Sequence, residues 1–130
     1  MDCPDCGATT LSVPVPAELR GSLPGEEPGV ALCQRCLATH PDPDPPADPP
    51  DLQRVSDAFP TNAGAAVPVA LAVGLLDSLA VHRSDIDDLL SRAERAGTDP
   101  LLVLDRLARD SDLNPAVDLA GRRRQLEQLR

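Results

Sequence analysis

The chain has 130 residues, enough for one domain or for a small module joined to a modest domain. Its 21 acidic and 12 basic residues give a net charge of -9, and every basic residue is an arginine. This balance argues against non-specific binding to nucleic acid, because such binding needs basic side chains that neutralise phosphates. It favours a halophilic archaeal source, where acidic, lysine-poor surfaces keep proteins soluble in molar salt, although a GC-rich genome is another explanation.

The N-terminus and the apolar runs indicate a cytoplasmic protein. Residues 1–6 lack the basic and apolar regions of an export signal. The longest uncharged apolar run, residues 63–76, contains Pro68 and is too short to span a bilayer, so we expect no membrane insertion. In the reducing cytoplasm we expect free thiols rather than disulfides.

All four cysteines lie in two CxxC pairs, which form a first knuckle (residues 3–7) and a second knuckle (residues 33–37). Two residues between the cysteines let both sulfurs of a knuckle face one ion, and Gly7 can adopt the positive φ that follows such a turn. Four thiolates in a tetrahedron suit Zn²⁺, with Zn–S distances of about 2.3 Å. The spacing therefore predicts one structural zinc ion bound by Cys3, Cys6, Cys33 and Cys36.

Three other uses of the cysteines fit the sequence less well. A redox dithiol normally has one CxxC at a helix start after a strand, and neither pair is in that context. A rubredoxin-like iron site is packed by several aromatic side chains, whereas Phe59 is the only aromatic residue here. A catalytic zinc keeps an open position and usually has histidine or carboxylate ligands. His40 could compete as a ligand, but beside four cysteines we expect it to be solvent-exposed at the start of a linker.

Residues 1–40 are predicted to form a small zinc ribbon. Residues 9–15 and 29–32 are the candidate strands, and residues 20–28, rich in Gly, Pro and Glu, form the loop between them. A module of this size without aromatics buries too little apolar surface to fold alone, so the metal must supply the folding free energy. Chelation is therefore expected to unfold the ribbon and to leave most of the helical signal intact.

A proline-rich segment, residues 41–50, follows with six prolines and three aspartates. Proline fixes φ and removes a backbone donor, so the segment predicts an extended, semi-rigid spacer. Pro-rich segments can also bind aromatic grooves, but no anchor side chains accompany these prolines. We interpret it as a linker.

Residues 51–130 predict an all-α domain of about four helices. Residues 67–81 are apolar on nearly all sides, which is typical of a buried central helix, and Pro68 is expected in its first turn. The turn before this helix contains Phe59, which we expect to anchor it by packing into the core.

The remaining helices are predicted from their end signals. Ser84 is a candidate N-cap for a second helix, which Gly97 is expected to close as a C-cap. Asp99 with Pro100 pairs an N-cap with proline at the first helical position, and Asn114 with Pro115 repeats that pair. Each pair predicts the start of a further helix, and the short connections predict neighbouring helices that pack together.

The only basic cluster is Arg122–Arg124, with Arg130 nearby. It could contact RNA, DNA or an acidic partner. The interpretation we favour is that these arginines complement the helix dipole and balance acids on neighbouring helices. His82 has no catalytic partner at a suggestive spacing and is read as a dipole partner at a helix C-terminus.

The Cys-Pro-Asp-Cys-Gly start, the Cys-Gln-Arg-Cys pair and the lysine-free acidic tail resemble the small CPxCG-type zinc-finger proteins of haloarchaea. Over most of its length the chain also resembles an uncharacterised haloarchaeal family with its turn at residues 59–61 and its Gly-Leu-Leu-Asp-Ser-Leu helix at residues 74–79. The second knuckle departs from the CPxCG pattern, with Gln34 and Leu37 in place of proline and glycine. The resemblance implies a zinc site and a regulatory or adaptor setting, and it implies no activity.

No glycine-rich phosphate loop and no nucleophile elbow occurs in the sequence, so we do not expect an enzyme. The prediction is a non-enzymatic zinc-ribbon adaptor that binds another protein. The alternative is a nucleic-acid-binding regulatory protein that uses the ribbon or the Arg122–Arg124 cluster.

Overall fold

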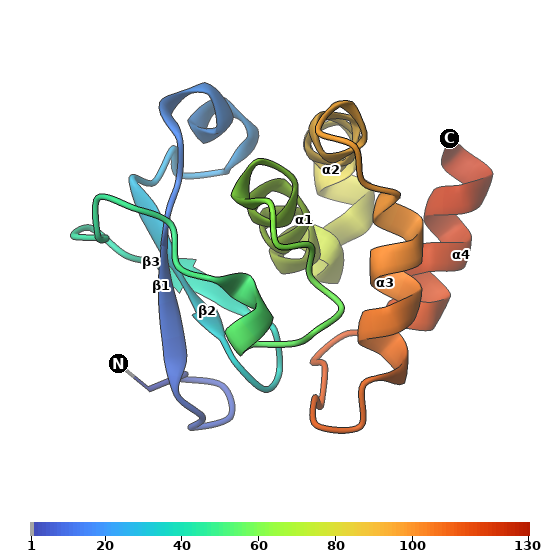
Figure 1. Ribbon diagram of the computed structural model, residues 1–130. Helices are drawn as coiled ribbons and strands as arrows, with labels where there is room; N and C mark the ends of the chain where they lie inside the picture. Colours follow the sequence, from blue (N-terminus) through green and yellow to red (C-terminus); the bar gives the residue numbers. More distant parts are fainter. Residues whose placement is uncertain (1) are drawn as a thin grey trace.

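The computed structural model describes residues 2–130 and has a three-stranded antiparallel sheet followed by four α-helices. The sheet forms one side of the molecule, helix α1 (Ala63–Leu75) lies in the middle, and helices α3 (Pro100–Arg109) and α4 (Leu119–Leu129) form the opposite side (Figure 1). The predicted fold class, a small cysteine-bearing β unit before about four helices, is confirmed.

The sheet has the order β1-β2-β3, with β1 at Thr10–Pro14, β2 at Gly29–Cys33 and β3 at Thr39–Pro41. Alternate side chains of β1 and β2 face the helices, because successive residues of a strand point to opposite sides. On that inner face Leu11 is paired with Leu32 and Val13 with Val30, and all four are buried. The first two strands match the predicted ones to within a residue or two at each end, whereas β3 was not predicted.

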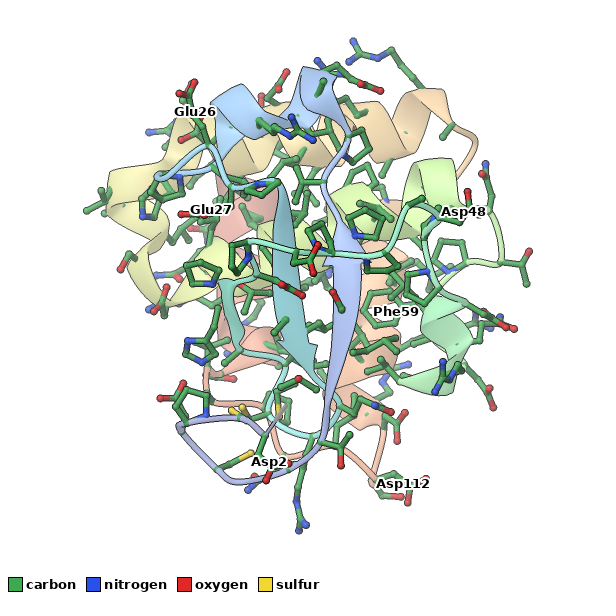
Figure 2. All side chains as sticks on the ribbon, turned by 90° about the vertical axis from the view of Figure 1, so that its left-hand side faces the viewer. Asp2, Glu26, Glu27, Asp48, Phe59 and Asp112 are labelled. Carbon is green, nitrogen blue, oxygen red and sulfur yellow. The ribbon has the colours of Figure 1, made fainter. Side chains whose placement is uncertain are left out.

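The proline-rich segment covers the outer face of this sheet. The backbone N–H of Asp42 donates to the carbonyl of Gly29 at 2.9 Å, and the hydroxyl of Ser12 donates to the Asp42 carboxylate. A Cβ on Gly29 would lie 2.4 Å from the Cβ of Pro45, so the segment touches the strand. Ala31, which points outward, is only 1% exposed. Figure 2 shows the chain crossing in front of the strands toward Asp48, so the segment packs on the sheet rather than holding two bodies apart.

Helix α1 is buried on nearly every side, as the apolar run predicted. It begins at Ala63, four residues before the predicted start, because the Asn62 side chain caps it by accepting from the N–H of Gly64 at 2.9 Å. Pro68 was expected in the first turn of the helix, but because α1 begins earlier it lies inside the helix. Its nitrogen has no hydrogen to donate to the preceding turn, so α1 lacks one internal hydrogen bond at this position.

The predicted helix over residues 67–81 is in fact divided. A short 3₁₀ turn, η3 (Leu76–Ser78), separates α1 from helix α2 (Leu79–Arg95). Helix α2 is kinked at His82, with φ -105° and ψ 17°. Ser84 lies within α2 and does not cap its start, so this N-cap prediction was wrong. Gly97 has φ 94° beyond the end of α2, as a C-cap glycine should.

Helices α3 and α4 test the two Asx-Pro signals. Asp99 caps α3 by accepting from the N–H of Leu102, and Pro100 is its first residue, so that prediction is confirmed. The Asn114 prediction was wrong, because Asp118 caps α4 instead. Residues 114–116 lie outside any helix, and the backbone N–H groups of Asn114 and Ala116 donate to the second knuckle.

One hydrophobic core joins the sheet to the helices. It contains inner-face residues of β1 and β2, the anchor Phe59, which is 1% exposed, and buried side chains from all four α-helices. The helical stretch Ala63–Arg95 is long and apolar enough to cross a membrane, but 67% of its most apolar window is buried inside the fold, as a core helix would be. Two 3₁₀ helices, η1 (Ala17–Ser22) and η2 (Leu52–Arg54), complete the fold.

Candidate metal centre

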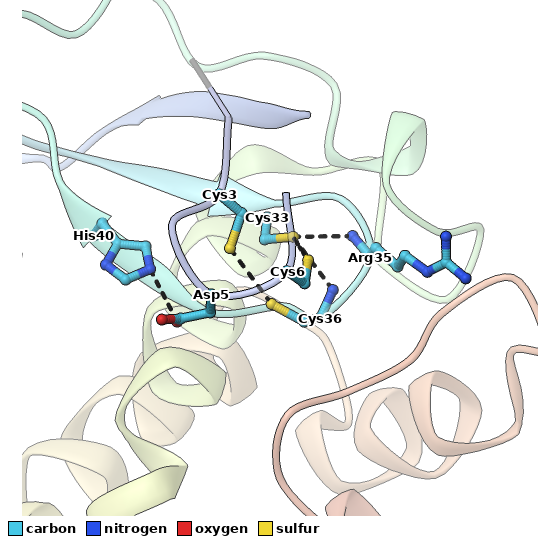
Figure 3. Close-up of polar contacts among 7 residues, drawn as sticks. All are labelled: Cys3, Asp5, Cys6, Cys33, Arg35, Cys36 and His40. Atoms are coloured by element: carbon cyan, nitrogen blue, oxygen red, sulfur yellow. Dashed lines mark hydrogen bonds and ion pairs between the residues drawn. The ribbon is translucent and has the colours of Figure 1, made fainter. Parts of the chain in front are cut away.

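The two knuckles bring four sulfur atoms together at one end of the sheet (Figure 3). The Sγ atoms of Cys3 and Cys36 are 3.7 Å apart, and those of Cys6 and Cys33 are 3.4 Å apart. All four sulfurs lie within 4.8 Å of one another. These separations are far longer than the roughly 2.05 Å of a disulfide. The cysteines are free thiols that point at a common centre.

The first knuckle is closed by backbone hydrogen bonds. The N–H of Gly7 donates to the carbonyl of Cys3 at 2.8 Å, and the N–H of Cys3 donates to the carbonyl of Ala8 at 2.8 Å. Gly7 has φ 80°, the left-handed conformation that was predicted for it. The turn therefore fixes both cysteines of this pair on the same side of the loop.

The second knuckle repeats this geometry without the glycine. The N–H of Cys33 donates to the carbonyl of Ala38 at 2.9 Å, as Cys3 does to Ala8. Leu37 occupies the position equivalent to Gly7 and has φ 64°, although its side chain is buried in the core. The N–H groups of Arg35 and Cys36 point at the Cys33 sulfur, at 3.4 and 3.3 Å. Such donors stabilise a thiolate.

The two thiols of the second knuckle have pKa values that their surroundings shift in opposite directions. Burial raises the pKa of the Cys33 thiol, but the N–H donors of Cys36 and Arg35 outweigh burial and lower the pKa to about 7. Burial raises the pKa of the Cys36 thiol to about 12. Cys33 therefore loses its proton readily, whereas a metal that binds Cys36 must displace a proton from it.

Three of the four cysteines are buried, and only Cys6 is exposed. The two knuckles are tied directly to each other, since the N–H of Gln34 donates to the carbonyl of Thr9 at 3.1 Å. They are also tied to the helical part of the chain. The N–H groups of Asn114 and Ala116 donate to the carbonyls of Arg35 and Cys36, at 2.8 and 3.0 Å. The centre is thus held from both ends of the sequence.

His40 lies beside the four-cysteine centre. It was expected to be solvent-exposed, but its side chain is only 30% exposed, and its Nε2 lies 3.2 Å from Oδ2 of Asp5 in the first knuckle. His40 sits in β3 opposite Ala31. Because β3 was not predicted, nothing in the sequence indicated that residue 40 folds back toward residue 5.

The basic cluster on α4 is partly occupied by ion pairs. Arg123 pairs with Asp105 on α3 at 3.1 Å and with Glu127 on its own helix. Arg130 pairs with Asp87 on α2 at 3.3 Å and with Glu94. The predicted balance of acids on neighbouring helices is confirmed for Arg123 and Arg130. The predicted helix-dipole role was wrong for Arg122–Arg124, because these residues lie before the last turn of α4 and not at its C-terminal end. Arg122 and Arg124 instead line an open depression with polar residues of α4.

Together these features define a small protein whose three-stranded sheet presents a four-cysteine centre able to hold a metal ion, packed against a helical unit. Over residues 2–130 the chain matches the model of a family of unknown function (DUF6276), and it belongs to that family. No curated protein and no solved structure is similar enough to match it. The predicted resemblance to an uncharacterised family is confirmed to that extent, while the archaeal source stays a prediction.

Proposed function

We propose that the four cysteines bind one structural Zn²⁺ and that the protein is a non-enzymatic adaptor for another protein. The observation that carries the metal assignment is the sulfur geometry. A tetrahedron with metal–sulfur bonds of about 2.3 Å has sulfur–sulfur edges of about 3.8 Å. The sulfur–sulfur distances of 3.7 Å from Cys3 to Cys36 and 3.4 Å from Cys6 to Cys33 are close to that edge length.

The donor set supports a structural and not a catalytic ion. Four thiolates fill a tetrahedral zinc and leave no position for a substrate or water. Burial of Cys3, Cys33 and Cys36 encloses the ion from the protein side. The role of the metal is then to hold the two knuckles, and the strands that carry them, in one arrangement.

Metal analysis tests the zinc assignment. The full chain, purified in molar KCl and dialysed without added metal, should retain about one zinc per chain by elemental analysis, because a closed four-thiolate site binds tightly. Cys33→Ser should lose it, since it removes a buried ligand, whereas Ser91→Ala, on the surface of α2, should retain it. A chain without zinc, or a Cys33→Ser variant with as much zinc as the wild type, would contradict the assignment.

Two observations support a protein partner. The net charge of -9 makes the surface unfavourable for phosphate backbones. Val81 and Leu129 are large apolar side chains that are 79% and 41% exposed, and both line one depression between α2 and α4. Exposed apolar side chains gathered in one place are typical of interaction surfaces. Of the arginine cluster, only Arg122 and Arg124 are available to the nucleic-acid alternative, because Arg123 and Arg130 are engaged by acids; the ribbon is its other candidate surface.

Partner capture from the native cytoplasm in molar KCl separates the two candidates. With the wild-type chain as bait we expect a protein whose recovery falls at least about tenfold with Val81→Ser/Leu129→Ser, because the apolar contact is lost. The matched control, Arg122→Ala/Arg124→Ala, should leave recovery unchanged. Loss of binding with the arginine variant, or after nuclease treatment, would instead support the nucleic-acid alternative.

A further inference from the structure

A second set of metal-ligand atoms lies beside the four sulfurs and shares one of them. The Sγ of Cys3, a carboxylate oxygen of Asp5 and a ring nitrogen of His40 all lie within 4.8 Å of one another. In Figure 3 the Asp5 carboxylate and the His40 ring face each other on one side of the sulfur cluster, and Arg35 extends on the other side. Thiolate, imidazole and carboxylate are the three donor types that zinc-like ions use in proteins.

The spacing of the two non-sulfur ligands suits a metal. Bonds of about 2.0–2.1 Å from zinc to oxygen and nitrogen give a tetrahedral edge of about 3.3 Å. The distance between Oδ2 of Asp5 and Nε2 of His40 is 3.2 Å. A hydrogen bond between the two side chains has the same length, so the decision depends on the third ligand, the charge and the available space.

The charge around Cys3 favours a second cation. A zinc ion with four thiolates carries a formal charge of -2, and the carboxylate of Asp5 adds to it. The cationic side chain of Arg35 lies on the far side of the cluster, away from Asp5 (Figure 3). A thiolate has more than one lone pair, so Cys3 can bridge the zinc to another ion.

There is also space for the remaining ligands of the ion. A cavity of about 130 Å³ is lined in part by Asp5, Cys36, His40 and Asp77, although not by Cys3. A water molecule takes about 30 Å³, so the cavity beside the Asp5 and His40 side chains has room for water bound to the ion. Within residues 2–130, the carboxylate of Asp77 in η3 makes no hydrogen bond or ion pair, and it lines the same cavity, so it can accept a hydrogen bond from water bound to the ion.

We propose that the chain binds a second, exchangeable divalent transition-metal ion through Cys3, Asp5 and His40, with Cys3 bridging to the structural zinc. The proposal rests on the zinc at the four cysteines. The second ion has fewer protein ligands and a more open position than the first, so it binds more weakly. It joins the first knuckle to β3, and through Asp77 it reaches the end of α1.

Cobalt titration of the zinc-loaded full chain tests this site. Wild-type protein should take up one equivalent of Co²⁺ beyond its retained zinc, with the near-ultraviolet charge-transfer band of a cobalt–thiolate bond. His40→Gln and Asp5→Asn should each weaken this uptake about tenfold or more and remove the band, while keeping the zinc and the circular dichroism spectrum. His82→Gln, which changes the other histidine at the α2 kink, should behave as the wild type.

Each outcome decides the matter. No uptake of cobalt by the zinc-loaded wild type, or uptake that His40→Gln and Asp5→Asn leave unchanged, overturns the second site and leaves Asp5 and His40 as a hydrogen-bonded pair only. Uptake without the charge-transfer band overturns the bridging role of Cys3. A chain that retains no zinc at the four cysteines contradicts the proposed function instead, and elemental analysis before the titration distinguishes that case.

Discussion

Leu37 shows how the second knuckle resolves a conflict between its backbone and the core. Its φ of 64° is a conformation that costs a residue with a side chain about 1–2 kcal/mol. Its side chain is 2% exposed and packs in the core shared by the sheet and the helices. Burial of a leucine contributes about 1.5–3 kcal/mol, which exceeds the backbone cost. This accounts for a leucine where the first knuckle has a glycine.

The balance predicts an unusual order of stabilities. Leu37→Ala loses the buried side chain and keeps the backbone strain, so it should be destabilised by about 2–4 kcal/mol. Leu37→Gly loses the same side chain but removes the strain, so it should be more stable than Leu37→Ala by about 1 kcal/mol. Denaturant unfolding of the zinc-loaded variants measures both values.

Leu11 provides the matched control for Leu37. It is buried in the same core but lies in β1, where the backbone is extended. There the alanine variant should be more stable than the glycine variant, because glycine weakens a strand. If alanine were the better substitute at position 37 as well, backbone strain would not explain this position.

At the level of single residues, the sequence was sufficient to predict a residue's role where its type and spacing have one common structural meaning. CxxC spacing located all four sulfur atoms, and Gly7 has the positive φ that its place after the second cysteine required. His40 was considered as a competing ligand but expected to be solvent-exposed, because its position depends on contact with Asp5, 35 residues away. Such a contact depends on the register of β3, which no local pattern of apolar residues encodes.

Among the helices and strands, end signals were reliable only where no tertiary contact competed with them. Among the described residues, the Asp99 side chain bonds only to the backbone N–H of Leu102, and it caps α3 as predicted. Asn114 offers the same local signal, but its backbone N–H donates to the carbonyl of Arg35 in the second knuckle, and no helix begins there. Ser84 lies two residues after the His82 kink, within α2, and does not cap the start of that helix, which Ser78 precedes. For Asn114 a longer-range interaction outweighed the local preference.

Gly74, near the end of α1, sets how closely that helix approaches β3. A Cβ at this position would lie 2.1 Å from Oγ1 and 3.0 Å from Cβ of Thr39. Gly74→Ala should therefore destabilise the protein by about 1–3 kcal/mol, although alanine is the better helix former. Adding Thr39→Ala removes the shortest of these contacts and should restore part of the loss, which a double-mutant cycle of unfolding free energies would detect.

The comparison for Gly74→Ala is Gly21→Ala in η1. No heavy atom lies within 4 Å of the Cβ that this change would add, so unfolding free energy should change by no more than about 0.5 kcal/mol. Equal stabilities for Gly74→Ala and the wild type would mean that the helix can move away from β3 at little cost.

For the whole molecule, composition suggested two bodies and a spacer, whereas the structure has one core. Proline content predicts a segment without helix or long strand, but it does not say whether that segment is solvated or packed. Here the outer face of the sheet is itself apolar at Gly29 and Ala31, and the proline-rich segment covers it. The inner face is covered by α1. Both faces of the central strand β2 are therefore buried, which compensates for the absence of aromatic side chains from the sheet.

This arrangement changes the expected result of metal removal. With separate bodies, chelation would unfold the ribbon and spare the helices. In the structure, Leu11, Val13 and Leu32 share a core with the helices, and Asn114 and Ala116 bond to the second knuckle. Loss of zinc withdraws a contribution of at least several kcal/mol from that joint unit. Since about 1 kcal/mol corresponds to a few degrees for a chain of this size, the melting temperature should fall by about 10 °C or more.

Far-ultraviolet circular dichroism in molar KCl follows the helices directly, while cysteine reactivity toward a thiol reagent follows the knuckles. We expect chelated protein to lose the helical signal and to expose its buried cysteines to the reagent in a single transition at the lower temperature, because the sheet and α1 cannot expose their shared core separately. Adding zinc back should restore the original transition. Helices that melt at the same temperature with and without zinc, after the cysteines have become reactive, would show that the helical unit is stable without the sheet and that their shared core contributes little to holding the molecule together.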